Sequence, residues 1–350
     1  MANECFSLCI FQVNVDEDAK KETLCKQELH LSRATDERSF YRAWCSEAKA
    51  VREQLQINTL SKNEPCSREA AFHYSFDFAQ QIHYPSNPFQ PGPIYFKTPR
   101  KCGIFGIHAE AFPQQINYLL DEAVASGKWA NVVISLLHHF LSFYGIGETD
   151  LRINADNCAG QNNIMLHYLC WRTIIGLHHS TYLHFLMAGH TKFSPDWCFG
   201  LFKQKFRKIF VSSLREIEQT VEGSTSESKI NRSQLVGDQD GTVIVPMYAW
   251  DTLLGGYFKK FVGILEQHHF WFTNQQPGVL FYKGFTDSEE QSIKILKRDI
   301  NPVDIDPEAR PVEIVPAGFS DARKAYLFKE IRPFCKAEER DFVCPNPNSY

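Results

Sequence analysis

The stretch LRINADNCAGQNNIMLHYL, residues 151–169, joins two kinds of periodicity around one carboxylate. Its first six residues alternate between apolar side chains and the polar side chains of Arg152, Asn154 and Asp156. This alternation is typical of a β-strand, and the apolar run from Ile164 is typical of a helix. The sequence therefore predicts a strand, an amide-rich turn and a helix, with Asp156 at the end of the strand. Asp156 either caps that helix or holds a charged ligand.

The segments on either side show similar periodicities. Residues 70–81 (AAFHYSFDFAQQ) alternate, with His73, Ser75 and Asp77 on one face and aromatic side chains on the other, as in a strand. Further elements are predicted as β-rich runs around a turn at 92–111, a strand at 116–123, helices at 127–145, 163–176 and 192–210, and a strand at 180–190. The resulting order, β-β-β-α-β-α-β-α, predicts an α/β fold.

Composition divides the 350 residues into four parts. Residues 1–70 are predicted to form a charged, helical arm and a linker, followed by an α/β core at 71–216. Residues 217–240 are polar and are predicted to be a loop, and 241–350 are predicted to be a small α+β extension. The arm carries a stripe of apolar residues near helical spacing: Leu29, Phe40, Trp44, Ala48, Val51 and Leu55. The extension is predicted to contain a strand at 241–250, a short helix, a hairpin turning at 275–278 and a final helix with Ser320 as N-cap.

Three acids stand at comparable positions in the core. Asp77 lies on the polar face of the first strand, Asp156 ends the fourth, and Asp196 falls in the first turn of the last helix, after the predicted N-cap Ser194 and Pro195. If the first and fourth strands are neighbours, these acids can meet. Three carboxylates suit two Mg²⁺ or Mn²⁺ ions, because hard cations prefer oxygen ligands. Such a pair activates a water or a 3′-hydroxyl and stabilises the leaving oxygen of a phosphodiester.

The order of elements and the acids resemble the ribonuclease H-like superfamily of nucleases, integrases and DDE/DDD transposases. The motifs ADNCAGQNN, GHTKFSPDWCFGLFKQKFR and SDARKAYLFKEIRPFC are similar to those of an uncharacterised transposase-derived domain family, over residues 70–350. The resemblance implies a mixed five-stranded sheet flanked by helices, and implies that Asp156 and Asp196 are catalytic acids. The first strand has no rigid motif, and we choose Asp77 as its acid. The expected activity is metal-dependent DNA strand cleavage and transfer.

Other polar residues surround this predicted site. His190, at the end of the last strand, either shuttles a proton or contacts phosphate, or it is a packed or capping histidine. The amides of Asn157 and Gln161 either contact phosphate or satisfy backbone groups in the turn. Five basic residues lie near Asp196 and form either a phosphate-contacting face or a solvated helix face: Lys192, Lys203, Lys205, Arg207 and Lys208.

Each acid also has an ordinary explanation. Asp77 can be a solvated carboxylate on an edge strand, Asp156 a helix cap, and Asp196 an acid favoured by the helix dipole. The net charge of −4 fits a free-standing transposase poorly. The alternative is therefore a domesticated, catalytically inactive scaffold that binds DNA or protein.

Location and assembly follow from composition. The 11 cysteines are scattered, without metal-binding spacing, and indicate reduced thiols in an intracellular protein, which is expected to be nuclear if it acts on DNA. No apolar run reaches the roughly 18 residues of a membrane span, so no membrane partner is expected. DNA is the expected partner, with a homo-oligomer as a possibility that the sequence leaves open.

Overall fold

The computed structural model describes residues 17–89, 92–124, 129–156, 159–187, 189–190, 192–225, 230–238 and 241–347. These residues form two compact units, each discontinuous in sequence. The first unit contains the described residues up to Tyr74 together with 146–192 and 254–309. The second contains 75–145, 193–253 and the residues from Arg310 onward. Strand β1 (Arg68–Tyr84) gives its first residues to the first unit and the rest to the second.

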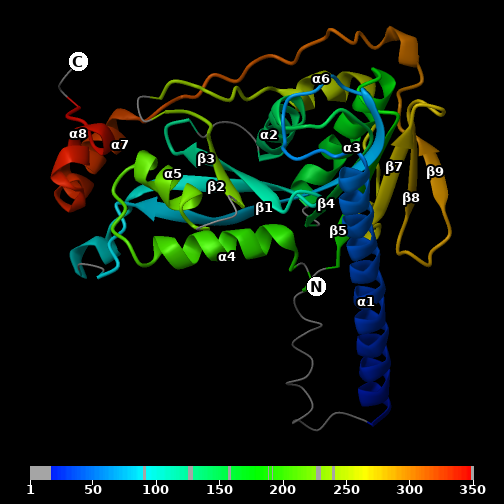
Figure 1. Ribbon diagram of the computed structural model, residues 1–350, viewed down its shortest axis with the longest axis horizontal. Coiled ribbons are helices and arrows are strands. Elements are labelled where there is room, and N and C mark those ends of the chain that lie inside the picture. Colours follow the sequence, from blue (N-terminus) through cyan, green and yellow to red (C-terminus); the bar gives the residue numbers. More distant parts are fainter. Residues whose placement is uncertain are drawn as a thin grey trace. The chain divides into compact units, whose positions relative to one another are not determined.

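The strands of the described residues form one mixed, nine-stranded sheet in the order β6-β3-β2-β1-β4-β5-β7-β8-β9. Figure 1 shows β7, β8 and β9 in succession within the first unit. The pairs β4–β5 and β3–β6 are parallel, whereas β2–β3, β5–β7, β7–β8 and β8–β9 are antiparallel. The α/β class is confirmed, but the sheet is larger than the five strands predicted. The additional strands continue the sheet at β3 and at β5, which would otherwise leave unpaired backbone groups at both edges.

The first unit combines a long helix with the central strands and the β7–β9 hairpins. Its elements are α1 (Glu17–Gln54), β4 (Glu148–Asp156), α3 (Ala159–Ile174), β5 (Ser180–Leu186), η3 (Ile264–Glu266), β7 (His269–Thr273), β8 (Val279–Lys283), β9 (Gln291–Lys294) and η4 (Pro302–Asp304). The predicted hairpin around residues 275–278 is confirmed as β7–β8. Helix α3 packs on β5 and β7, and its apolar positions from Met165 to Trp171 are buried.

Only the second half of α1 has a continuous buried stripe. Its buried residues are Ala34, Glu37, Tyr41, Trp44 and Ala48, at alternating spacings of three and four residues. This spacing keeps one face of the helix against its neighbour β5. The predicted stripe is therefore correct for Trp44 and Ala48. It is wrong for Leu29 and Leu55, which are exposed.

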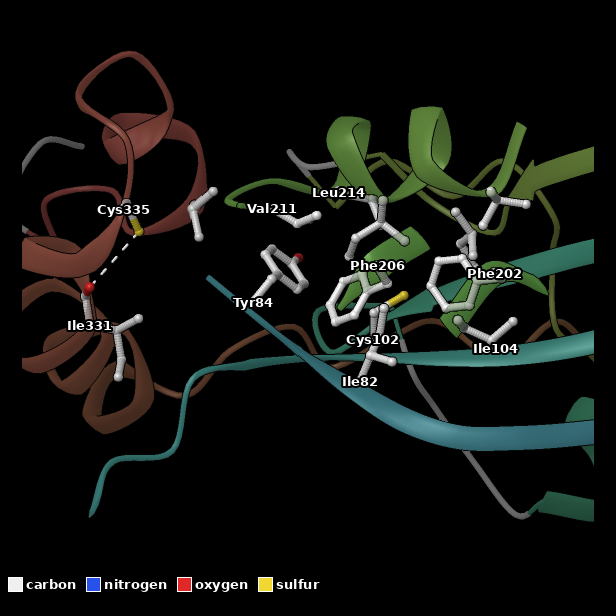
Figure 2. Packing of buried hydrophobic residues seen from close by; sticks show 14 of the residues in the cluster. Ile82, Tyr84, Cys102, Ile104, Phe202, Phe206, Val211, Leu214, Ile331 and Cys335 are labelled. Carbon is white, nitrogen blue, oxygen red and sulfur yellow. Dashed lines mark hydrogen bonds between the residues drawn. The ribbon is translucent and has the colours of Figure 1, made fainter. Parts of the chain in front are cut away.

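The second unit packs α4 and α5 against its strands. Its elements are β2 (Arg100–Ala109), β3 (Gln114–Asp121), α2 (Trp129–Phe143), α4 (Ser194–Phe206), α5 (Leu214–Glu222), β6 (Asn231–Leu235), α7 (Asp321–Tyr326), α8 (Arg340–Val343) and the short helices η2 (Gly92–Phe96), η5 (Leu327–Ile331), η6 (Arg332–Phe334) and η7 (Ala337–Glu339). Helix α6 (Trp250–Tyr257) contributes to both units. Figure 2 shows the rings of Phe202 and Phe206 beside Ile104 and Ile82 in the main apolar cluster. Ser320 caps α7 as predicted, since its hydroxyl accepts a hydrogen bond from the Arg323 amide.

Three predicted segments differ from the structure. The predicted loop at 217–240 contains the end of α5 and the strand β6, which pairs with β3. The predicted strand at 241–250 forms only isolated bridges, at Val243 and Tyr248. The first β-rich run of 92–111 is the 3₁₀-helix η2, and only the second is a strand. No helix within the described ranges is long and apolar enough to cross a membrane.

Candidate functional site

The polar face of β1 is buried. The predicted alternation holds, but His73 and Ser75 have no exposed surface, and Asp77 is half-buried. The cause is the position of β1, which lies between β2 and β4 and is not an edge strand. Asp77 is therefore not the solvated edge carboxylate that a single strand would suggest. Buried polar side chains require partners, and each part of β1 finds them within its own unit.

In the second unit, Glu110 connects β1 to the start of α4. The Ser75 hydroxyl donates to Glu110 Oε1 over 2.6 Å, and the Ser194 hydroxyl donates to Glu110 Oε2 over 2.8 Å. Glu110 directly follows β2 and is 4% exposed. Ser75 stands two residues before Asp77, and Ser194 stands two residues before Asp196. The carboxylate of Glu110 thus brings the segments that carry two of the predicted acids together.

Sequence reasoning missed Glu110. The signal was present, because Glu110 is an acid at the end of an apolar strand, in the same relation to β2 as Asp156 to β4. Its partners lie 35 and 84 residues away along the chain, so no local pattern identifies them. The predicted capping role of Ser194 is wrong for the same reason. Ser194 is the first residue of α4, Phe193 is the N-cap, and the serine hydroxyl is used by Glu110.

Asp196 is exposed and performs one structural task. The backbone N–H of Phe193 donates to Asp196 Oδ2 over 3.2 Å, which satisfies a donor at the start of α4. Its other oxygen, Oδ1, forms no hydrogen bond with the described residues. Asp77 accepts a hydrogen bond at Oδ1 from the Phe78 amide over 2.7 Å. Asp196 Oδ1 is therefore accessible to a further ligand, whereas Asp77 is half-buried.

A thiol and an imidazole lie beside Glu110. Cys198 Sγ is 3.5 Å from His108 Nδ1, and His108 Nε2 is 3.9 Å from Glu110 Oε2. The order of these groups is that of a thiol nucleophile with its base. However, Cys198 is fully buried, and burial, reinforced by the charge of Glu110, raises the pKa of its thiol to about 12. A raised pKa disfavours the thiolate, which is the form of cysteine that acts as a nucleophile.

In the first unit, β4 ends at Asp156, which is exposed. The preceding Asn154 on the same face accepts a hydrogen bond from His73 Nε2 of β1 over 2.8 Å. The Arg68 amide donates to the Gly147 carbonyl over 2.8 Å, and the Thr149 hydroxyl bonds the backbone of Ala70. Contacts that advance together along both strands are those of a parallel pair. The first and fourth strands are therefore neighbours, as predicted.

Histidines of the first unit hold α1. Glu37 of α1 lies 2.8 Å from Nε2 of His269 and accepts a hydrogen bond from the Thr286 amide over 2.8 Å. His269 Nδ1 is in turn 3.1 Å from His184 Nδ1, and the Trp44 ring lies 4.2 Å from the His184 ring. Burial and the neighbouring His269 lower the pKa of His184 well below its usual value. His184 is therefore neutral, and the cluster positions a helix within an apolar surrounding.

The remaining predicted residues of this region divide into two groups. Partial burial, with His30 and Arg38 nearby, lowers the pKa of His190, and Arg38 also donates to its carbonyl over 3.2 Å. The His190 ring packs against the His30 ring at 5.0 Å between centroids, and Arg38 of α1 holds the His190 carbonyl, so the geometry favours the packed alternative. Asn157 lies outside the described residues. Gln161 belongs to α3, but its side chain is not among those that the structure describes.

The basic residues near α4 do not act as one face. Lys205 donates to the Gly223 carbonyl over 2.6 Å and so binds the end of α5. Lys192 and Lys208 are exposed. Lys203 and Arg207 line a cavity of about 350 Å³ in the second unit. The predicted phosphate-contacting face is thus reduced to two residues at a defined hollow.

The described part of the chain contains no group of three or more His, Cys, Asp or Glu side chains arranged to hold a metal ion. Asp77 and Asp196 belong to the second unit, and Asp156 belongs to the first. As donors, all three provide the carboxylate oxygen that Mg²⁺ and Mn²⁺ prefer, and two of the three are exposed. The chemistry of the donor set therefore fits these cations.

A comparison with known protein families identifies the family of this chain. The profile of a domain of unknown function, DUF7869, matches residues 104–288. This match covers more than half of the 350 residues. The chain belongs to the DUF7869 family. A search of curated proteins and a search of solved structures returned no match.

The DUF7869 match begins within β2 and ends beyond β8. It includes Glu110, Asp156 and Asp196, and it leaves Asp77 and all of β1 outside. The matched region also contains β6, β7 and β8, whereas β9 lies beyond its end.

Proposed function

We propose that this DUF7869 protein is a transposase-derived, metal-dependent nuclease with a ribonuclease H-like core, and that Asp77, Asp156 and Asp196 are its catalytic acids. The single observation that carries the proposal is the arrangement of the central strands. Within the sheet, β3, β2, β1, β4 and β5 are consecutive, and the first and fourth strands are adjacent. This adjacency is what the resemblance requires of a five-stranded core.

The pairing of β1 with β4 supports the choice of Asp77. Arg68 of β1 donates to the Gly147 carbonyl, and the Ala70 amide donates to the Thr149 hydroxyl, so the start of β1 lies beside the start of β4. By alternation, Asp77 shares the face of β1 that carries His73, and Asp156 shares the face of β4 that carries Asn154.

Glu110 supports the choice of Asp196. It binds one serine two residues before Asp77 and another two residues before Asp196. In the proposed site, Glu110 is a positioning residue that fixes the start of α4 on β1. The Phe193 amide holds Asp196 Oδ2, which leaves Oδ1 for a ligand.

The three carboxylates would hold Mg²⁺ or Mn²⁺. When bound, such ions supply activation of a water or 3′-hydroxyl and stabilisation of the leaving oxygen at a DNA phosphodiester. The acids would provide oxygen ligands for these ions. Glu110, with its two serine partners, keeps the segments that carry Asp77 and Asp196 together. Without cations, acids gathered at one place would repel each other.

Mn²⁺-dependent nicking of supercoiled plasmid DNA tests the proposal. Wild-type protein is expected to nick the plasmid, and Asp156→Asn is expected to reduce the rate at least about 100-fold, since even residues that only support metal ligands affect activity 10- to 100-fold. Asp150→Asn, on the same strand β4, is the matched control and should retain the activity. Equal nicking by wild type and Asp156→Asn would contradict the proposal and indicate a contaminating nuclease or another site.

A second candidate is an inactive scaffold that binds DNA or protein. The net charge of −4 and the lack of a gathered metal-ligand group among the described residues favour it. Its expected result in the same assay is no metal-dependent nicking by any variant, with a folded protein.

A further inference from the structure

We propose that the cavity at the end of α4 binds a single DNA strand, with Lys203 and Arg207 on its phosphates and the ring of Tyr95 stacked on a base. This inference deepens the proposed function, and rests on it for the choice of DNA. The cavity lies wholly within the second unit, between the end of β1, η2 and the last turn of α4. Its volume of about 350 Å³ falls in the range of sites that hold small ligands, so it has room for a nucleotide-sized group.

The charge of the cavity favours an anion. The described residues that line the cavity include three basic residues, Lys97, Lys203 and Arg207, and no Asp or Glu. Lys97 forms an ion pair with Glu330 and is neutralised. Lys203 and Arg207 form no ion pair with a described residue. In a protein of net charge −4, two unpaired cations in one hollow are a local site for phosphate.

The aromatic residues indicate a base next to that phosphate. Tyr95 lines the cavity and is 75% exposed, and the adjacent Phe96 is 87% exposed. Exposed aromatic rings beside basic side chains are the usual surface for single-stranded nucleic acid, because every base can stack on a ring. The opposite side of the cavity is fixed: Ile82 and Phe206 belong to the buried cluster shown in Figure 2.

The cavity is also at a suitable distance from the acids of its own unit. Gln80, which lines the cavity, is three residues beyond Asp77 on β1, or about 10 Å at 3.3 Å per residue. Lys203 is seven residues beyond Asp196 on α4, or about 10 Å at 1.5 Å per residue. A strand with a rise of about 3.4 Å per nucleotide covers this distance with roughly three nucleotides. A strand lying across the acids would therefore reach the cavity.

Fluorescence anisotropy with a labelled oligothymidylate, in EDTA so that no metal is bound, tests the proposal. Lys203→Gln combined with Arg207→Gln is expected to lower the slope of log affinity against log salt by about 1.4, because each phosphate contact on a single strand contributes about 0.7. Tyr95→Ala is expected to weaken binding at least about 5-fold. Lys208→Gln, next to Arg207 but outside the cavity, is the matched control and should bind like wild type.

Three outcomes would overturn the inference: an unchanged salt slope in the double variant, an equal loss of affinity in Lys208→Gln, or tighter binding of an oligouridylate than of the oligothymidylate. Glutamine retains the aliphatic stem of each side chain, and equal thermal unfolding midpoints confirm that the variants fold. Binding without metal is independent of cleavage. If the wild type does not nick DNA but the cavity variants weaken binding, the proposed nuclease is refuted and the cavity is not. If the wild type nicks DNA but the cavity variants bind like it, only the cavity proposal is refuted.

Discussion

The two units satisfy the buried polar face of β1 in different ways. In the first unit, His73 bonds Asn154, and the neighbouring histidines and Glu37 form a closed set beneath α1. In the second unit, Ser75 and Ser194 donate to Glu110, and Asp196, two residues after Ser194, is exposed. A closed set of partners stabilises a fold, whereas an exposed acid can bind a ligand. The comparison predicts that the first cluster serves stability and that the second supports the proposed site.

The largest effect on stability is expected from Glu37→Ala in the first unit. This change leaves His269 in a buried site without its carboxylate and removes the acceptor of the Thr286 amide. Each buried donor that loses its acceptor costs about 1–3 kcal/mol, so the free energy of unfolding should fall by about 2–6 kcal/mol. Urea denaturation measures it. Glu47→Ala is the control on the same helix, because Glu47 is exposed in its ion pair with Arg152, and it should change stability by less than about 1 kcal/mol. Equal destabilisation by Glu37→Ala and Glu47→Ala would contradict the role of the first cluster in stability.

Glu110→Ala should have the next largest effect. It leaves the buried Ser75 hydroxyl and the Ser194 hydroxyl without their shared acceptor, which lowers the free energy of unfolding by about 2–3 kcal/mol. Glu110→Gln keeps an amide oxygen and should lower it by less than about 1 kcal/mol. Urea denaturation compares the two, and nicking should follow the same order. Full activity of Glu110→Ala would show that Glu110 does not position the acids.

Low pH should destabilise the first unit through protonation of His178. Burial and the charge of Arg172, which donates to Nδ1, lower the pKa of His178 to about 4, despite the nearby Glu148. The unfolded state, with a histidine pKa near 6.5, takes up a proton first. As pH falls from about 6.5 towards 4, the free energy of unfolding therefore decreases by up to about 1.4 kcal/mol per pH unit for this group. Urea denaturation at several pH values should show a smaller slope in His178→Asn. An unchanged slope would assign the pH dependence to other groups.

The smallest effect on stability is expected from an acid of the proposed site. Asp196→Asn keeps an acceptor for the Phe193 amide and loses only a charge near the start of α4. Such a charge contributes about 0.3–1 kcal/mol, so thermal denaturation should show little change. Nicking should nevertheless be lost. A large destabilisation would mean that Asp196 serves the fold and would remove the contrast between the two clusters.

Much of the fold could be predicted because the periodicity of its central elements is strong. The alternation in β4, the apolar stripe of α2, the continuous apolar run of β5 and the turn between β7 and β8 all predict the elements that form. These patterns are local: each depends on residues within one strand, one helix or one hairpin.

The larger sheet could not be predicted, because its additional pairings are not local. Strand β6 has the sequence NRSQL, which lacks the apolar alternation of a central strand, and only Asn231 is buried. It forms because β3 offers an unpaired edge. The polarity of the segment alone predicts a loop.

The sequence predicts the candidate acids but not the residues that support them. The predictions of Asp156 and Asp196 depend on motifs that lie within a few residues of each acid. Glu110 gains its partners only when β1, β2 and α4 come together, and the local sequence around Ser194 predicts a cap that does not form.

The central claim is that Asp156 holds a divalent cation, and isothermal titration calorimetry with Mn²⁺ tests it most directly. Wild-type protein and Asp150→Asn are predicted to bind Mn²⁺, and Asp156→Asn is predicted to bind it at least about 10-fold more weakly. Equal Mn²⁺ affinity of all three proteins, or no binding by the wild type, would contradict the account.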